Sequence, residues 1–173
     1  IINVAFGLTI GSSNTIVREN TIQYFTNDAC RVLGSDIVFE KNKVYDLIKV
    51  MTQAENHDDM FQAWTTANSP GQDTLKNNII QYNLFVNITD TTRQYRGHAQ
   101  GIGCFDGVYK NWRVENNIVM VDHWHGISFY GGVNCVIINN TVLDPYLYSP
   151  IDPYDNNTSK IGPAWIRIDK KTN

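Results

Sequence analysis

Short apolar segments recur along the chain in a fixed order, separated by glycine and asparagine. Each copy contains an apolar strand, a glycine-containing turn, a second strand, and an asparagine followed shortly by another apolar side chain. The clearest copies span residues 7–22, 30–44 and 127–142, and two looser copies begin at Gln62 and Ile102. A sequence pattern that repeats in this way predicts a solenoid, in which each repeat stacks on the next.

The asparagines of the five copies align in one column. They are Asn20, Asn42, Asn83, Asn116 and Asn140. The steps between them are 22, 41, 33 and 24 residues. Two short steps and two longer ones indicate a constant repeat with insertions, mainly between the third strand of one copy and the first strand of the next. Stacked asparagines can hydrogen-bond from copy to copy and satisfy buried backbone groups, which predicts a structural role for the column.

Inside each copy the apolar residues alternate with polar ones or run in β-branched pairs, as in residues 15–17 and 136–138. This pattern favours strands over helices. Residues 44–54 differ because their apolar positions have helical spacing, so a helical turn and a third strand followed by irregular chain both remain open. Residues 145–163 are rich in Pro, Asn and Tyr and predict a long surface loop before a final strand at 165–168.

With these features the chain resembles the pectate-lyase-like superfamily of right-handed parallel β-helices, which includes polysaccharide lyases, mannuronan C5-epimerases and phage tailspikes. The resemblance covers most of residues 6–142 and rests on the repeated phrase, the asparagine column, and the segments HGISFYG (125–131) and CVIINNTV (135–142). It implies an all-β fold, a right-handed parallel β-helix with long loops inserted on one side. No complete catalytic set of one family matches. We expect residues 1–173 to form a single β-helix domain, an excerpt of a longer chain.

Composition argues against nucleic-acid and membrane partners. The 173-residue chain has a formal net charge of -3, and its longest basic cluster is residues 170–171. No apolar run approaches the roughly 18 residues that a membrane helix needs. We therefore expect neither nucleic acid nor a membrane as a partner. The three cysteines, Cys30, Cys104 and Cys135, cannot all pair and lack metal-type spacing, so we interpret them as small buried apolar residues.

Alternation along the first strand of each copy predicts which side chains point outward. The expected outer column is Arg31, Gln62, Gly103, Ser128 and Arg167. A second, polar column precedes it and contains Asp28, Asp59, Gln100 and His125.

All four histidines lie beside this predicted edge, in the segments 57–59, 95–98 and 122–125. Imidazole and carboxylate groups side by side suit proton abstraction and delivery, because each shifts the pKa of the other. The catalytic candidates are Asp59, His98, His123, His125 and Asp106. The substrate-binding candidates are Arg31, Gln62, Arg96, Trp124, Tyr130 and Arg167.

Two chemistries fit these candidates. In a lyase or epimerase, a base removes the C5 proton of a uronic acid while a cation neutralises the adjacent carboxylate. In a glycoside hydrolase, Asp59 pairs with Asp58, Asp106 or Asp122. The lyase or epimerase interpretation is preferred. The identity of any metal stays open, with calcium possible from the acidic loops and the resemblance.

The leading hypothesis is therefore a carbohydrate-active β-helix that binds an extended, acidic polysaccharide and cleaves or epimerises it. The alternative is a non-catalytic structural or glycan-binding β-helix of a virion spike or surface protein. Either hypothesis implies an extracellular, cell-surface or virion-associated location. A homotrimer is a further possible assembly, because exposed strand edges and open solenoid ends need covering.

Overall fold

The computed structural model describes residues 1–48, 58–65, 74–90, 92, 97–145 and 163–169. All regular structure in these residues is β-strand, and every pair of neighbouring strands runs parallel. The all-β expectation is thus confirmed for the described part of the chain.

The strands form three large parallel sheets and one small one. Sheet 1 contains, in spatial order, β2 (Leu8–Ile10), β5 (Cys30–Val32), β8 (Asp58–Trp64), β12 (Ala99–Asp106), β16 (His125–Tyr130) and β20 (Trp165–Asp169). Sheet 2 contains β3 (Ile16–Arg18), β6 (Val38–Glu40), β10 (Ile79–Gln81), β14 (Arg113–Glu115) and β18 (Val136–Ile138). Sheet 3 contains β1 (Ile2–Val4), β4 (Thr21–Phe25), β7 (Lys43–Leu47), β11 (Leu84–Val86), β15 (Ile118–Met120) and β19 (Thr141–Leu143). The small sheet contains β9 (Thr74–Lys76), β13 (Val108–Lys110) and β17 (Gly132–Val133).

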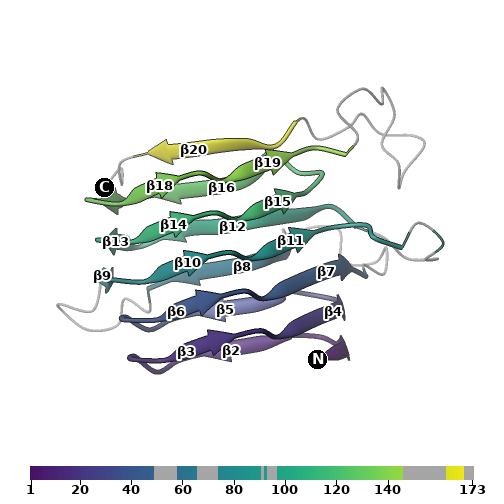
Figure 1. The fold of residues 1–173 in the computed structure, drawn as a ribbon, viewed down its shortest axis with the longest axis horizontal. Helices are drawn as coiled ribbons and strands as arrows, with labels where there is room; N and C mark the ends of the chain where they lie inside the picture. The colour runs from purple at the N-terminus through teal and green to yellow at the C-terminus, as the bar shows by residue number, and fades with distance from the viewer. Residues whose placement is uncertain (49–57, 66–73, 91, 93–96, 146–162, 170–173) are drawn as a thin grey trace.

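The chain visits the three large sheets in a repeating order, from sheet 1 to sheet 2 to sheet 3 and back. Strands of successive passages therefore lie side by side in every sheet and stack in chain order from purple to yellow (Figure 1). Three of the longest connections, β7–β8, β11–β12 and β19–β20, lead from sheet 3 to sheet 1, where insertions were expected. The β8–β9 connection is a further insertion at a different point of the repeat.

Side chains that alternate inward from the three large sheets share one apolar core. Phe39 of sheet 2, Phe61 of sheet 1 and Phe85 of sheet 3 are at most 1% exposed and meet in its interior. The ring of Phe61 lies 5.2 Å from that of Phe39 and 6.4 Å from that of Phe85. Aromatic residues from all three sheets thus fill the space that the sheets enclose.

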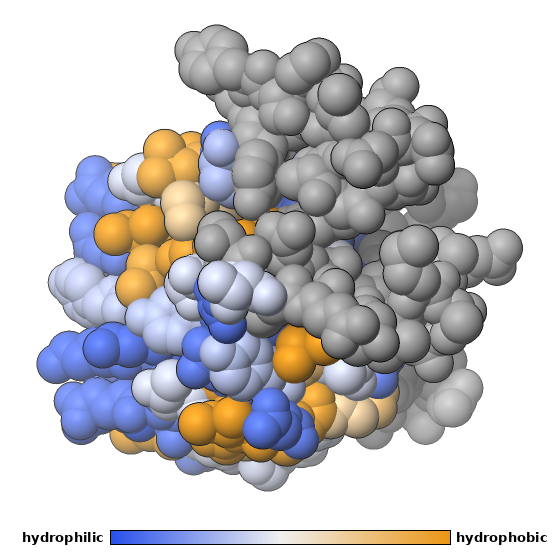
Figure 2. All heavy atoms as spheres, turned by 90° about the vertical axis from the view of Figure 1, so that its right-hand side faces the viewer, coloured by the Kyte–Doolittle hydropathy of each residue, from blue (hydrophilic) through white to orange (hydrophobic). Residues whose placement is uncertain are grey.

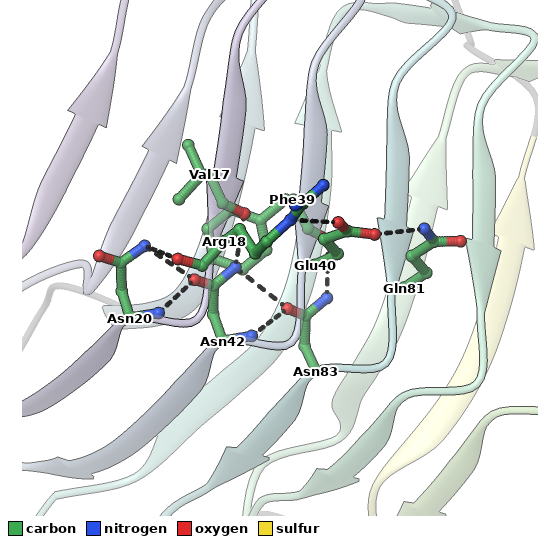
Figure 3. A network of polar contacts seen from close by, with 8 residues as sticks. All are labelled: Val17, Arg18, Asn20, Phe39, Glu40, Asn42, Gln81 and Asn83. Carbon is green, nitrogen blue, oxygen red and sulfur yellow. Dashed lines mark hydrogen bonds and ion pairs between the residues drawn. The ribbon is translucent and has the colours of Figure 1, made fainter.

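A ladder of asparagine side chains crosses the bend between sheets 2 and 3. The backbone N–H of Asn20 donates to Asn42 Oδ1 at 3.0 Å, and that of Asn42 donates to Asn83 Oδ1 at 2.9 Å (Figure 3). The ladder continues from Asn83 to Asn117 and from Asn117 to Asn140, each at 3.0 Å. The predicted structural column is therefore present.

One member of that column was predicted wrongly, because Asn117 and not Asn116 belongs to the ladder. Asn116 occupies the bend one residue earlier, with a φ of 55°. The residues before the other ladder asparagines have the same left-handed backbone. They are Glu19, Lys41, Tyr82 and Asn139, with φ between 54° and 59°. Either residue of the Asn116–Asn117 pair suits either position by type, since asparagine tolerates the left-handed region.

Three other expectations can be compared with the structure. The helical alternative for residues 44–54 is wrong at its start, because β7 is a strand through Leu47, and residues 49–57 lie outside the described part. The final strand appears as β20. Cys30 and Cys104 are buried as expected, whereas Cys135 is only partly buried. Burial raises the pKa of the Cys30 and Cys104 thiols.

Exposed apolar side chains gather at the two ends of the stack. Ile166 and Ile168 of the edge strand β20 pair in register with Ile127 and Phe129, which are fully buried. The two isoleucines are about half exposed because β20 is the last strand of sheet 1. Figure 2 shows hydrophobic residues gathered toward the bottom and the upper left of the described surface, with hydrophilic residues between them.

Candidate functional site

The outward face of sheet 1 carries the column predicted from alternation. The strand register pairs Arg31 with Gln62, Gln62 with Gly103, Gly103 with Ser128, and Ser128 with Arg167. Side chains paired across parallel strands lie on the same face of the sheet. These five residues from five adjacent strands therefore form a single row across sheet 1.

Buried polar side chains lie three residues before this row. Asp59 and Gln100 are paired in register and are at most 3% exposed. Asp28 Oδ1 accepts the Asp59 backbone N–H at 3.1 Å, and Asp28 Oδ2 accepts Arg31 Nε at 2.8 Å. Three members of the predicted column, Asp28, Asp59 and Gln100, therefore lie below the accessible surface, whereas the fourth, His125, is partly exposed.

Gly103 makes room for two of these groups. A Cβ placed on Gly103 would lie 2.4 Å from Asp59 Oδ1 and 2.6 Å from the Phe105 ring. The carboxyl and the ring therefore both lie over the backbone of this glycine. The absent side chain is what allows Asp59 and the outward-facing Phe105 to approach each other on the middle strand of the row.

Six aromatic and imidazole side chains contact one another in a chain of ring pairs and form what we call the ring cluster. They are Phe105, His123, Trp124, His125, Tyr130 and Trp165. The Phe105 ring packs edge-on against His125 at 4.9 Å and against Tyr130 at 5.3 Å. Trp124 and Trp165 stack in parallel at 5.9 Å, and their side chains are 43% and 37% exposed. The cluster thus presents aromatic faces at the surface of sheet 1.

His125 is oriented from several sides. Its Nδ1 lies 2.9 Å from Ser128 Oγ, and His123 stacks on its ring at 5.4 Å. Tyr130 and Trp165 contact the same imidazole at 5.9 and 5.8 Å. A register shift between His125 and Ile127 accompanies this placement at the start of β16. Among the catalytic candidates, the structure brings His123 and His125 into ring contact.

His98 lies in a different environment. Its Nδ1 is 3.0 Å from Asp122 Oδ2, and the Asp122 side chain is 1% exposed. Asp122 Oδ1 accepts Asn87 Nδ2 at 2.9 Å and the Ala99 backbone N–H at 3.3 Å. The Asp122 carboxylate therefore links sheets 3 and 1 from inside, and it holds His98 as part of that structural network.

Two arginines of the row each lie between aromatic rings. The Arg31 guanidinium lies 3.5 Å from the Phe6 ring centroid and 5.6 Å from that of Trp64. The Arg167 guanidinium lies 5.2 Å from Tyr130 and 5.6 Å from Trp165, and its Nε donates to Asp169 Oδ2 at 2.7 Å. Cation–π contact fixes the plane of each guanidinium at the surface.

The remaining candidates are dispersed. Asp106 is exposed at the end of β12, where its carbonyl accepts the Thr65 backbone N–H at 2.8 Å. Arg96 and His57 lie outside the described residues. Phe6 and Trp165 were missed as site residues. The alternation that placed Arg167 outward also places Trp165 outward, whereas nothing local links Phe6 to Arg31.

Asp59 holds its proton more firmly than an ordinary carboxyl. Burial raises its pKa well above the usual 3.8, and repulsion from Asp28 and Asp58 raises it further. The folded state therefore keeps a proton at pH values where the unfolded chain has released it. Stability from this group is fully present below pH 3.8 and is lost as pH rises through the raised pKa.

We expect the variant Asp59→Asn to remove this pH dependence. Its free energy of unfolding, measured with urea between about pH 4 and 8, should rise relative to wild type as pH increases, because asparagine has no proton to lose. Parallel pH profiles for the two proteins would show that Asp59 ionises at its ordinary pKa in the fold.

No group of three or more His, Cys, Asp or Glu side chains that could hold a metal ion occurs within the described ranges. In the same part of the chain, no helix has the length and apolar character to cross a membrane.

Comparisons with known proteins identified no relative of this chain. The chain matches no family model, no curated protein and no solved structure.

Proposed function

We propose that this chain is a right-handed parallel β-helix of the pectate-lyase-like type and that it binds an extended, acidic polysaccharide on the outward face of sheet 1. The parallel pairing of every strand and the repeating passage through three sheets support the fold. Parallel strands joined by crossovers within one sheet are nearly always right-handed, which supports the handedness.

The observation that carries the functional proposal is the ring cluster, which lies beside the outward row of sheet 1 that begins at Arg31 and ends at Arg167. Exposed indole and phenol faces suit the apolar faces of sugar rings, and guanidinium groups suit carboxylates. Trp124, Trp165 and Arg167 supply both kinds of group within one surface. A polymer of uronic acids presents both matching features in every unit.

We further propose that the site cleaves or epimerises this polymer, with His125 as the acid–base group. In the lyase reaction His125 takes the C5 proton, the C5–H electron pair forms the C4=C5 double bond, and the C4–O bond breaks. Tyr130 donates its proton to the leaving oxygen, and Arg167 neutralises the uronate carboxylate while charge builds at C5. In the epimerase reaction C5 instead receives a proton on its opposite face.

One observation favours the non-catalytic alternative, in which the same face only binds glycan. Asp28 is paired with Arg31, Asp122 is paired with His98, and burial raises the pKa of Asp59. Carboxylates engaged in ion pairs of this kind contribute to holding the fold. On this alternative the chain is a structural or adhesive module of a virion spike or surface protein.

Activity on uronates separates the two functions. We expect wild-type protein to release unsaturated uronates, measured by absorbance, or to change the epimer composition, measured by NMR, on one of alginate, pectate and capsular polysaccharides. The double variant His123→Ala/His125→Ala should lose roughly 100-fold or more of this activity because the acid–base group is gone. Assays with and without calcium test the metal expectation directly.

A matched control is Arg113→Gln, which alters an arginine on the outward face of sheet 2 and should leave activity unchanged. Binding without unsaturated products, new reducing ends or epimer change on every polysaccharide would contradict catalysis and support the binding function. An extracellular, cell-surface or virion location and assembly into a homotrimer belong to the same proposal.

A further inference from the structure

The row across sheet 1 carries the same kind of cluster at both of its ends. Arg31 lies against two aromatic rings and bonds through Nε to Asp28. Arg167 lies against two aromatic rings and bonds through Nε to Asp169. The two clusters lie at opposite ends of the row, on β5 and β20, and share no residue.

In each cluster a carboxylate binds the guanidinium through its Nε atom. The carboxylate partner engages Nε, and the aromatic contacts fix the plane of the group. A guanidinium has five N–H donors, so the terminal nitrogens remain suited to a ligand carboxylate. The Arg31 and Arg167 side chains are 26% and 48% exposed, which keeps both within reach of a ligand on this face.

The register fixes the separation of the two arginines. The row runs from Arg31 to Arg167 through Gln62, Gly103 and Ser128, one residue per strand. Four strand spacings of about 4.8 Å place the two ends of the row roughly 19 Å apart. The ring cluster, with His125 beside Ser128, lies between the middle of the row and its Arg167 end.

We infer that Arg31 and Arg167 are two carboxylate subsites at the ends of one binding track, which sets a minimum length for tight-binding oligouronates. An extended pyranose unit is about as long as one strand spacing, so about five units are needed to reach both arginines. Shorter oligomers reach only one. This inference rests on the proposed function, because it takes the ligand to be a uronate polymer.

Simultaneous contact at both ends makes the second contact intramolecular. Affinity should therefore rise by roughly tenfold or more between oligomers of about four and about six units, beyond the gradual gain per added sugar. Removing either arginine should abolish this step. Oligomers too short to span the row should be affected by one of the two substitutions at most, according to the end at which they bind.

The test measures binding of size-defined oligouronates of about three to eight units by calorimetry, using the polymer that wild-type protein binds best. The variants are Arg31→Gln, Arg167→Gln and the double variant, and thermal unfolding confirms that each folds. Arg113→Gln is the matched control, because Arg113 also pairs with an acidic residue two positions later and its side chain is also 48% exposed. The control should keep the step near five units.

The expected result is one step in wild type and control and no step in either single variant. The double variant should bind long oligomers more weakly than either single variant, because it lacks both carboxylate subsites. A smooth length dependence in wild type would overturn the inference and leave the proposed binding function intact. If both single variants lost affinity equally for short and long oligomers, the inference would likewise be overturned and the proposed binding function would stand. Absence of binding at every length would overturn the proposed function together with the inference.

Discussion

The variant Phe61→Ala is expected to lose about 3–5 kcal/mol of unfolding free energy. Phe61 is the residue of sheet 1 that contacts both Phe39 of sheet 2 and Phe85 of sheet 3. Its removal leaves a cavity where the three sheets meet, and a fold of stacked strands has little freedom to collapse into it. Domains of this size are stable by only about 5–15 kcal/mol, so the loss removes a large part of the total.

Urea unfolding followed by circular dichroism measures this effect. Tyr82→Ala is the control, since Tyr82 is 54% exposed and its loss should change stability by about 0.5 kcal/mol or less. Equal losses for the two variants would mean that Phe61 does not join the sheets in a packed core.

The variant Asn83→Ala is expected to lose about 4 kcal/mol. Asn83 Oδ1 accepts the Asn42 backbone N–H, and Asn83 Nδ2 donates to the Phe39 carbonyl at 2.9 Å and to Asn117 Oδ1 at 2.9 Å. Alanine removes the side-chain partner of the buried Asn42 N–H and of the Phe39 carbonyl, at about 1–3 kcal/mol for each, whereas Asn117 Oδ1 keeps the Asn83 backbone N–H. The loss should exceed that of an ordinary surface asparagine because no water reaches the centre of the ladder.

The ladder supplies its own control. Asn20→Ala removes the first asparagine, whose side chain donates to the Arg18 carbonyl and to Asn42 Oδ1 but accepts no ladder bond within the described residues. It should cost about 1 kcal/mol or less. Similar losses at Asn20 and Asn83 would show that the ladder contributes no more at its buried centre than at its end.

The candidate site combines buried carboxyls with surface aromatic and arginine side chains, and the two kinds of group have different roles. The buried carboxyls of Asp28 and Asp122 accept backbone N–H groups and orient Arg31 and His98, so they act first on the fold. The ring cluster and Arg167 lie at the surface, where a ligand can meet them. The proposed glycan binding rests on these surface groups, whereas the proposed lyase or epimerase chemistry also requires His125 and Tyr130 to act on a bound sugar.

The sequence by itself determined the repeat, the strand content and the outward row of sheet 1. Each of these depends on local alternation, which sets the face of a strand residue whatever lies beside it. Arg31, Gln62 and Ser128 could be placed in one row because each occupies the same position in its own strand. The long insertions from sheet 3 to sheet 1 follow from the unequal steps between asparagines.

Tertiary structure alone decided which asparagine of the pair Asn116 and Asn117 enters the ladder. Both are the same residue type, and only the hydrogen bonds from the neighbouring repeats select Asn117. The contact of Phe6 with Arg31, the pairing of His98 with Asp122, and the raised pKa of Asp59 also depend on groups from distant parts of the chain. The register between repeats, the burial of a side chain and its pKa all depend on how the strands stack. A local sequence pattern therefore does not predict them.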